Sequence, residues 1–179
     1  MSNATDDFDL TQDELRVVAR FAAKAAQGVL VEFERARPGD LRPRTAIDAA
    51  WTFINGASRS KLQRVASLDA HRAAKEAPTE SARLAAQAAG DAASAAYLHP
   101  IAKGNQVGHI LRAPANAVRI AEIAAGDDAT VAESLVLQAC QLATPTLIDV
   151  LCRYPLAPAS KNRAGRLMND LDAALRSKH

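Results

Sequence analysis

The stretch ESARLAAQAAGDAASAAYL, residues 80–98, contains nine alanines. Alanine has the highest helix propensity and loses no side-chain entropy when it is buried. Within the stretch, a seam with the 4-3-4-3 spacing of a helix face comprises Leu84, Ala88, Asp91, Ala95 and Leu98. This spacing predicts an amphipathic α-helix whose small side chains let neighbouring helices approach closely.

Asp91 is the only charged residue of this seam. A buried carboxylate without a partner is costly, so we expect Asp91 at the edge of the helix bundle or paired with an arginine. We also expect Arg42 or Arg44 to form an ion pair with an acid on another helix, and Asp91 is the first candidate for that acid.

The whole chain shares this composition. It has 179 residues, of which 41 are alanine; 49% are hydrophobic and only 4% are aromatic. No segment shows sustained alternation of apolar and polar residues, so no sheet is expected. We predict an all-α, alanine-rich bundle of about seven or eight helices, formed by residues 11–179 as a single domain. Residues 1–10 are expected to be a disordered N-terminus, in which Ser2-Asn3-Ala4 resembles the remnant of an expression tag.

The two helices that precede this stretch have clear end signals. TQDE at Thr11–Glu14 is a capping box, and Pro38 and Gly39 end the first helix. Pro43 fits the first turn of the second helix and Gly56 fits the position just past its end. Trp51 shares the apolar face of this second helix, so we expect it to point into the core.

The remaining helices are predicted with less regular boundaries. Residues 58–77 form a helix that turns Leu62, Val65, Ala66, Ala70 and Ala73 inward. Residues 101–125 form two short helices or one kinked helix, because Gly104, Gly108 and Pro114 interrupt the pattern. Further helices are expected at 129–143, from Thr144 to about Arg153, and at about 162–176.

Charge, cysteines and the start of the chain restrict the class of protein. The net charge is +2 and the pI is about 8.7, which is too mild to indicate nucleic-acid binding. Cys140 and Cys152 lie in apolar helical sequence and are expected to be reduced thiols of a cytoplasmic protein. The acidic start MSNATDDFD predicts no signal peptide, and no apolar run reaches transmembrane length. His71, His99, His109 and His179 lack metal-ligand spacing, so we expect no metal. The sequence also has no Gly-rich phosphate loop, no G-x-S-x-G and no His-Glu-x-x-His motif, so we expect no cofactor and no enzymatic activity.

Two features are candidates for binding. The segment from Arg35 to Arg64 holds six arginines and one lysine against Asp40 and Asp48. It is either a platform for an acidic partner or a solvated face with local ion pairs, such as Arg44 with Asp48. The second feature is the pair Asp69 and His71, in which the histidine forms a pH-sensitive contact with a carboxylate or is an ordinary helix residue.

Three stretches carry a resemblance: PGDLRPRTAIDAAWTFINGASR, ASLDAHRAAKEA and ARLAAQAAGDAASAAYLHP. Together they resemble the family of immunity proteins of bacterial polymorphic-toxin systems, over about residues 10–125. The residues that match are Gly39, Asp40, Arg42, Pro43, Arg44, Ala46, Ile47, Ala49 and Ala50, then His71 and Glu76, then Gly90. The chain has Asp91 and Tyr97 where this family often has histidines. The resemblance implies an inhibitor that neutralises a toxin domain by direct binding.

Three functions therefore stay open. The first is a non-enzymatic cytoplasmic binding protein with a protein partner, such as a cognate toxin domain, and no role for a membrane. The second is a helical small-ligand protein or enzyme with a polar pocket near Arg42, Arg44 and His71. The third is a nucleic-acid-associated helical protein, similar to a subunit of an exonuclease. The residues expected to contact a partner or ligand are Arg42, Arg44, Trp51, His71 and Asp91.

Overall fold

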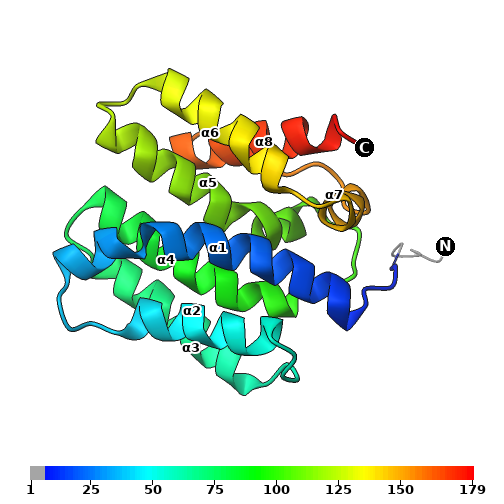
Figure 1. Cartoon of the computed structure of the whole chain (residues 1–179), viewed down its shortest axis with the longest axis horizontal. Coiled ribbons are helices and arrows are strands. Elements are labelled where there is room, and N and C mark those ends of the chain that lie inside the picture. The colour runs from blue at the N-terminus through cyan, green and yellow to red at the C-terminus, as the bar shows by residue number, and fades with distance from the viewer. Residues whose placement is uncertain (1–6) are drawn as a thin grey trace.

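The computed structural model describes residues 7–179 as an array of helices (Figure 1). Within these residues there is no strand, and one isolated antiparallel bridge joins Asp7 to Ile101. Two short 3-10 helices span Ala95–Tyr97 and Gly104–Gln106. The prediction of an all-α protein with seven or eight helices is confirmed. The α-helices are α1 (Gln12–Ala36), α2 (Arg42–Ile54), α3 (Lys61–Lys75), α4 (Glu80–Ser94), α5 (Val107–Ala124), α6 (Ala129–Leu142), α7 (Pro145–Cys152) and α8 (Arg163–Arg176).

The alanine-rich helix α4 lies at the centre of the structure. It packs against α1, α2, α3 and α5, and Figure 1 shows it directly behind α1. Its contact positions are almost all alanine, so neighbouring helices can approach it from several sides. The fully buried alanines of this helix are Ala82, Ala85, Ala86, Ala88, Ala89, Ala92 and Ala93.

The ends of the helices follow the signals in the sequence. The Thr11 hydroxyl accepts a hydrogen bond from the Glu14 N–H at 3.1 Å, and the Glu14 carboxylate accepts one from the Thr11 N–H at 2.8 Å. Pro43 lies in the first turn of α2. Gly56 follows the end of α2 with a φ of 111°, a left-handed conformation that favours glycine. The capping predictions for both helices are confirmed.

Helix α3 is rotated relative to the prediction. Leu62, Val65 and Leu68 are about half exposed, whereas Ala66, Ala70 and Ala73 are buried. The cause is Gln63, which is only 1% exposed. Its amide oxygen accepts from the Ser60 N–H at 2.9 Å, and its amide nitrogen donates to the Ala49 carbonyl at 3.0 Å. This buried side chain, in which the amide oxygen and the amide nitrogen both have a hydrogen-bond partner, lies on the inward face of α3, so the inward placement of Leu62 and Val65 was wrong.

The segment 101–125 forms one continuous α-helix, α5, after the 3-10 turn at Gly104–Gln106, with Pro114 inside it. The last helices begin and end within one or two residues of the predicted positions. Leu167, Leu171 and Leu175 of α8 are buried in the main hydrophobic core. The C-terminal helix therefore belongs to the same core as the alanine-rich helices.

Part of the N-terminal segment is held by loop residues that lie between the helices. The Phe8 N–H donates to the Pro100 carbonyl at 3.2 Å, and its ring meets Tyr154 edge-on with centroids 4.9 Å apart. The expected disorder of residues 1–10 was therefore wrong for residues 7–10. Residues 1–6, which include Ser2-Asn3-Ala4, lie outside the described residues.

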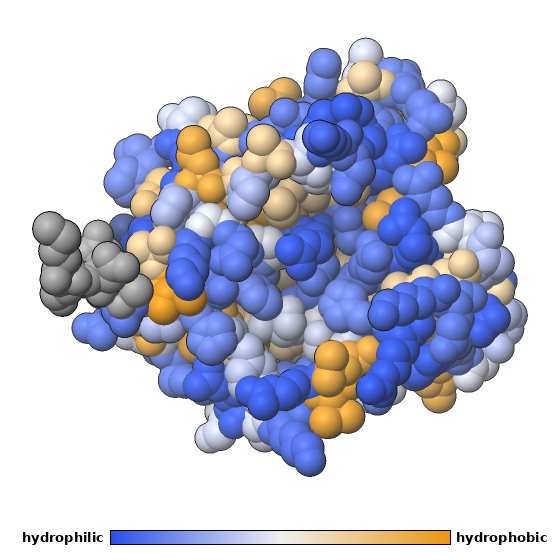
Figure 2. All heavy atoms as spheres, turned by 180° about the vertical axis from the view of Figure 1, so that it is seen from behind, coloured by the Kyte–Doolittle hydropathy of each residue, from blue (hydrophilic) through white to orange (hydrophobic). Residues whose placement is uncertain are grey.

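Figure 2 shows that the face opposite to that of Figure 1 is mainly polar and that its apolar side chains gather in small, separate patches. In residues 7–179, no single helix has the length and hydropathy needed to cross a bilayer. Helices α6 and α7 meet that criterion only as a pair, joined by a bend of 104°.

Candidate functional site

Arg42 connects three segments of the chain. Its guanidinium contacts Asp40 in the loop before α2 and Glu76 at the end of α3, both at 2.6 Å. Arg37 adds a second contact to Glu76 at 3.3 Å. The hydrogen bond from Arg42 lowers the pKa of the Asp40 carboxyl. We call Asp40, Arg42 and Glu76 the Arg42 clamp, and it holds the entrance of α2 against the end of α3.

Arg44 pairs with a different helix. Its Nε donates to Glu34 of α1 at 2.7 Å. The predicted pair with Asp48 was therefore wrong. The expectation that Arg42 or Arg44 forms an ion pair with an acid on another helix is confirmed by Arg44 and Glu34 of α1, but Asp91 as the acid was wrong.

Most other arginines of the segment from Arg35 to Arg64 are also engaged within the chain. Arg35 lies 3.5 Å from Glu32. The guanidinium groups of Arg59 and Arg64 lie 5.0 and 4.9 Å from the centre of the Tyr97 ring. These contacts favour the interpretation of the segment as a solvated face with internal ion pairs.

Trp51 is only partly buried. Its indole N–H donates to the Gln27 side chain of α1 at 3.0 Å, and the Arg20 guanidinium lies 5.8 Å from its ring centre. Phe53, which is 0% exposed, fills the core instead. Trp51 packs against the main hydrophobic core but is not fully buried, because its indole N–H is bonded at the seam between α1 and α2, so the prediction that it points into the core is confirmed in part.

His71 and Asp91 lie together on facing helices. The His71 Nε2 is 3.6 Å from Asp91 Oδ1, and Arg112 of α5 donates to the same oxygen at 3.1 Å. Gly90 makes this approach feasible, since a Cβ at that position would lie 2.7 Å from the His71 ring. Asp69 instead contacts Arg72 at 2.8 Å. The carboxylate beside His71 is thus Asp91, whereas the sequence had suggested Asp69.

Asp91 is incompletely bonded. It is 2% exposed, and its Oδ2 has no hydrogen-bond partner within residues 7–179. Burial raises the pKa of the Asp91 carboxyl, while the charges of Arg112 and His71 act in the opposite direction. The prediction that Asp91 pairs with an arginine is confirmed, and this arginine is Arg112.

His109 lies on α5 near the same cluster. Its Nδ1 is 3.1 Å from the Ser94 hydroxyl, which also contacts the Asp91 carbonyl at 3.0 Å. Burial lowers the pKa of His109 to about 4, and the charge of Arg112 adds to this effect. The imidazole is therefore a weak base, poorly suited to activating Ser94 as a nucleophile near neutral pH.

A second ionic cluster fastens the C-terminal helix. Glu122 of α5, 2% exposed, accepts hydrogen bonds from Arg163 at 3.0 Å and from Arg119 at 2.7 Å. The hydrogen bond from Arg163 lowers the pKa of the Glu122 carboxyl. This cluster joins α5 to the first turn of α8, and we call these three residues the Glu122 cluster.

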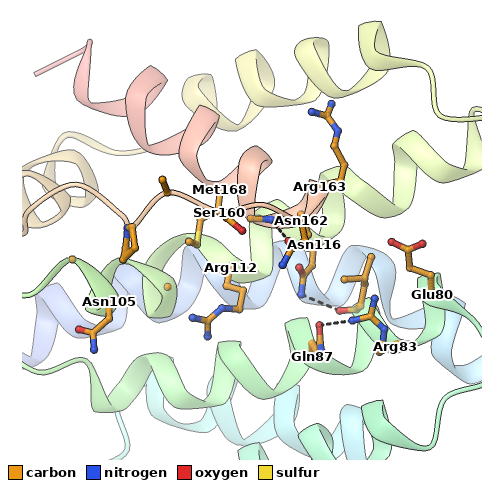
Figure 3. A pocket seen from close by; sticks show the side chains of 17 residues that line it. Glu80, Arg83, Gln87, Asn105, Arg112, Asn116, Ser160, Asn162, Arg163 and Met168 are labelled. Atoms are coloured by element: carbon orange, nitrogen blue, oxygen red, sulfur yellow. Dashed lines mark hydrogen bonds between the residues drawn. The ribbon is translucent and has the colours of Figure 1, made fainter.

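A polar cavity of about 510 Å³ lies between α4, α5 and the segment that leads into α8. Figure 3 shows Arg83 and Arg112 on its walls, while the Arg163 side chain points away from those two. Arg83 is near Gln87 and Arg112 contacts Asp91. Arg42, Arg44 and His71 do not line this cavity. The polar pocket predicted near those three residues is therefore a different place from this cavity, and it stays a prediction.

An apolar groove of about 550 Å³ lies between α1, α5 and α6. Its charged lining residues are Arg20 and Lys24 of α1, and no acid from the part of the chain that the structure describes lines it. Gly28 lies in its α1 wall, with open space where a Cβ would be.

Within residues 7–179, no three His, Cys, Asp or Glu side chains are grouped so that they could hold a metal ion. Cys140 is buried, Cys152 is half-buried, and neither is in a disulfide. Burial raises the pKa of both thiols.

The fold and these contacts define an all-helical protein whose buried ionised groups serve mainly to join its helices. A family model described as "Imm-5 like putative immunity protein" matches residues 9–142. The chain therefore belongs to this family, as its motifs suggested. No curated protein and no solved structure matches the chain.

The residues that carried the resemblance meet in two places. Asp40, Arg42 and Glu76 form the Arg42 clamp, and Gly39 has a φ of 88° in the turn before it. His71 lies over Gly90 beside Asp91. In this chain the motif residues therefore connect α2, α3 and α4.

Sequence reasoning missed Arg112, Glu122, Arg20 and Lys24. Of these features, only the apolar groove could have been indicated by the sequence. Helix α6 has a single charged residue, Glu133, and Gly28 is a poor helix former within the long, capped helix α1. The ionic partners are far apart in the chain, so spacing could not indicate them.

Proposed function

We propose that this chain is a non-enzymatic, cytoplasmic immunity protein that neutralises a toxin domain by binding it directly. The observation that carries this proposal is the family match over residues 9–142. A helical body with capped helices and internally paired charges suits such a role, because a rigid surface loses little entropy on binding.

The proposed absence of catalysis is supported by the chemistry of the polar groups. The Ser94–His109 contact has a histidine with a pKa of about 4. The acids Asp40, Glu76 and Glu122 are engaged by arginines. Groups held in this way contribute to structure more readily than to proton transfer.

A nucleic-acid role has less support. The net charge is +2, and Tyr97, an aromatic residue next to the basic segment, is already covered by Arg59 and Arg64. Stacking on bases requires accessible rings and an unneutralised basic surface.

The test is to express the C-terminally tagged chain in the native organism, purify it through the tag, and identify the bound proteins by mass spectrometry. A toxin domain recovered in stoichiometric amount, whose toxicity the chain suppresses in cells, is the expected result. A chain that binds no toxin domain, or that carries a small molecule instead, contradicts the proposal and directs attention to the polar cavity lined by Arg83 and Arg112.

A further inference from the structure

The apolar groove has the form of a place for one more helix. Helices α1 and α6 both pack against α5 but have little contact with each other, and in Figure 1 they lie on either side of α5. Residues from all three helices line the space between them. Its α1 wall runs from Val17 to Val29, which is about 18 Å or roughly three turns of a helix.

The chemistry of the walls indicates a protein partner. Helix α6 has one charged residue, Glu133; its Leu142 is 71% exposed and lines the groove, whereas Leu137, 64% exposed, lies outside it. Leu142, Leu135 and Ala139 face the groove. Scarcity of charge together with an exposed leucine is typical of an interface core rather than of an ordinary helix surface.

The rim of the groove is positive. Arg20 and Lys24 lie one turn apart on α1, and neither has a carboxylate partner within residues 7–179. Arg20 lies over the Trp51 ring. An occupant with acidic side chains along one edge would pair with both cations and leave no like charges opposed.

Gly28 is the most informative residue of the wall. It lies in the middle of α1, where glycine costs about 1 kcal/mol relative to alanine. Nothing lies within 4 Å of the place its Cβ would take, so no intramolecular contact requires it. A side chain there would narrow the groove.

The outer face of α3 is a weaker candidate. Leu62, Val65 and Leu68 are exposed there, but this face belongs to a single helix that also carries Lys61, Arg64, Asp69 and Arg72. It has neither a concave form nor a consistent charge, so we do not place a partner on it.

We propose that the groove between α1, α5 and α6 is the surface that receives the toxin, in the form of an amphipathic helix with an apolar face and an acidic edge beside Arg20 and Lys24. This inference rests on the proposed function. Helix-in-groove binding of this kind anchors the apolar side chains of the partner at i, i+3, i+4 and i+7.

The test measures the affinity of the full-length chain for the toxin domain recovered above, by isothermal titration calorimetry. Gly28→Trp fills the groove without removing a contact. Its matched control is Ala173→Trp, on the exposed face of α8 outside the groove. We expect Gly28→Trp to weaken binding by about 30-fold or more, as for the loss of an interface hot spot, and Ala173→Trp to bind like the wild type. Circular dichroism on both variants establishes that they are folded.

A second pair of variants tests the charge. Lys24→Glu should weaken binding and reduce its dependence on salt, whereas Lys103→Glu, outside the groove, should change neither. If the wild type binds the toxin and all four variants bind equally well, the groove inference is overturned while the proposed function stands. A wild type that binds no toxin overturns both. A wild-type dimer that Gly28→Trp converts to a monomer would assign the groove to a second copy and overturn the inference.

Discussion

At the residue scale, the cluster around Asp91 shows how a buried charge is accommodated in an alanine-rich core. One carboxylate oxygen of Asp91 contacts Arg112 and His71, and the other has no hydrogen-bond partner among the described residues. The small residue Gly90 gives His71 the room to approach. The cluster joins α3, α4 and α5 at a point where the surrounding alanines offer little side-chain contact.

Two glycines within helices should respond differently to the same substitution. Gly28→Ala should stabilise the protein by about 1 kcal/mol, because it gains helix propensity and meets open space. Gly90→Ala should be less stable than Gly28→Ala by about 1–2 kcal/mol, because the new methyl group displaces His71 from Asp91. Urea denaturation measures both. In a His71→Ala background this difference should largely disappear, and its persistence would exclude His71 as the cause.

His109 predicts a pH dependence of stability. Its pKa falls from 6.5 to about 4 in the folded state, so the unfolded chain binds the proton more tightly. With respect to this histidine, the free energy of unfolding is therefore highest above pH 6.5. It decreases by at most about 3 kcal/mol as the pH falls from 6.5 towards 4. Urea denaturation from pH 4 to pH 7, comparing the wild type with His109→Gln, should show a flatter profile for the variant. An NMR titration of His109 with a midpoint near 6.5 would be inconsistent with this explanation.

At the element scale, ion pairs fix how helices are joined. The Arg42 clamp holds the entrance of α2 to the end of α3, and the Glu122 cluster holds α8 to α5. Glu122 is 2% exposed, whereas Glu76 is half exposed on its side chain. Exposed pairs contribute little, and removal of one partner from a buried pair is costly. The Glu122 cluster should therefore matter more for stability.

Glu122→Ala should destabilise the protein by about 3 kcal/mol, since it leaves Arg119 and Arg163 without their shared carboxylate. The loss should be concentrated in α8, seen as faster hydrogen exchange in Arg163–Arg176. Glu80→Ala is the matched control: Glu80 is 3.4 Å from the same Arg119 but its side chain is 50% exposed. It should cost less than about 1 kcal/mol. Equal effects of the two substitutions would contradict the assigned role of burial.

At the scale of the whole molecule, the core extends beyond the region that the family model matches. The match ends at residue 142, whereas Leu167, Leu171 and Leu175 of α8 are at most 1% exposed. Helix α8 packs on α5 and α6. The matched region alone would therefore expose an apolar face of these helices.

A chain that ends at Leu142 should not fold as a stable unit. Each of the three buried leucines of α8 contributes about 1.5–3 kcal/mol, which together is a large part of the usual 5–15 kcal/mol of stability. Circular dichroism and thermal unfolding should show no cooperative transition. A chain that ends at Arg176, which removes only three exposed residues, should unfold like the full-length protein. Cooperative unfolding of the chain that ends at Leu142 would mean that the rest of the fold does not depend on α8 for its stability.

The sequence by itself determined the helices. Capping boxes, prolines at first turns, glycines after the last turn and 3.6-residue periodicity are local, so Thr11, Pro43, Gly56 and the alanine-rich seam of α4 could be read without a structure. The family membership also followed from short motifs.

Only the tertiary structure decided which helix faces meet and which charges pair. Gln63 turned Leu62 and Val65 outward because its hydrogen bond reaches Ala49 on another helix. Arg44 forms an ion pair with Glu34 rather than with Asp48, and Asp91 forms one with Arg112 of α5. The groove arises from the relative placement of α1, α5 and α6. These outcomes depend on contacts between residues far apart in the chain, whose packing and electrostatic energies are set jointly by several helices, and no local pattern encodes them.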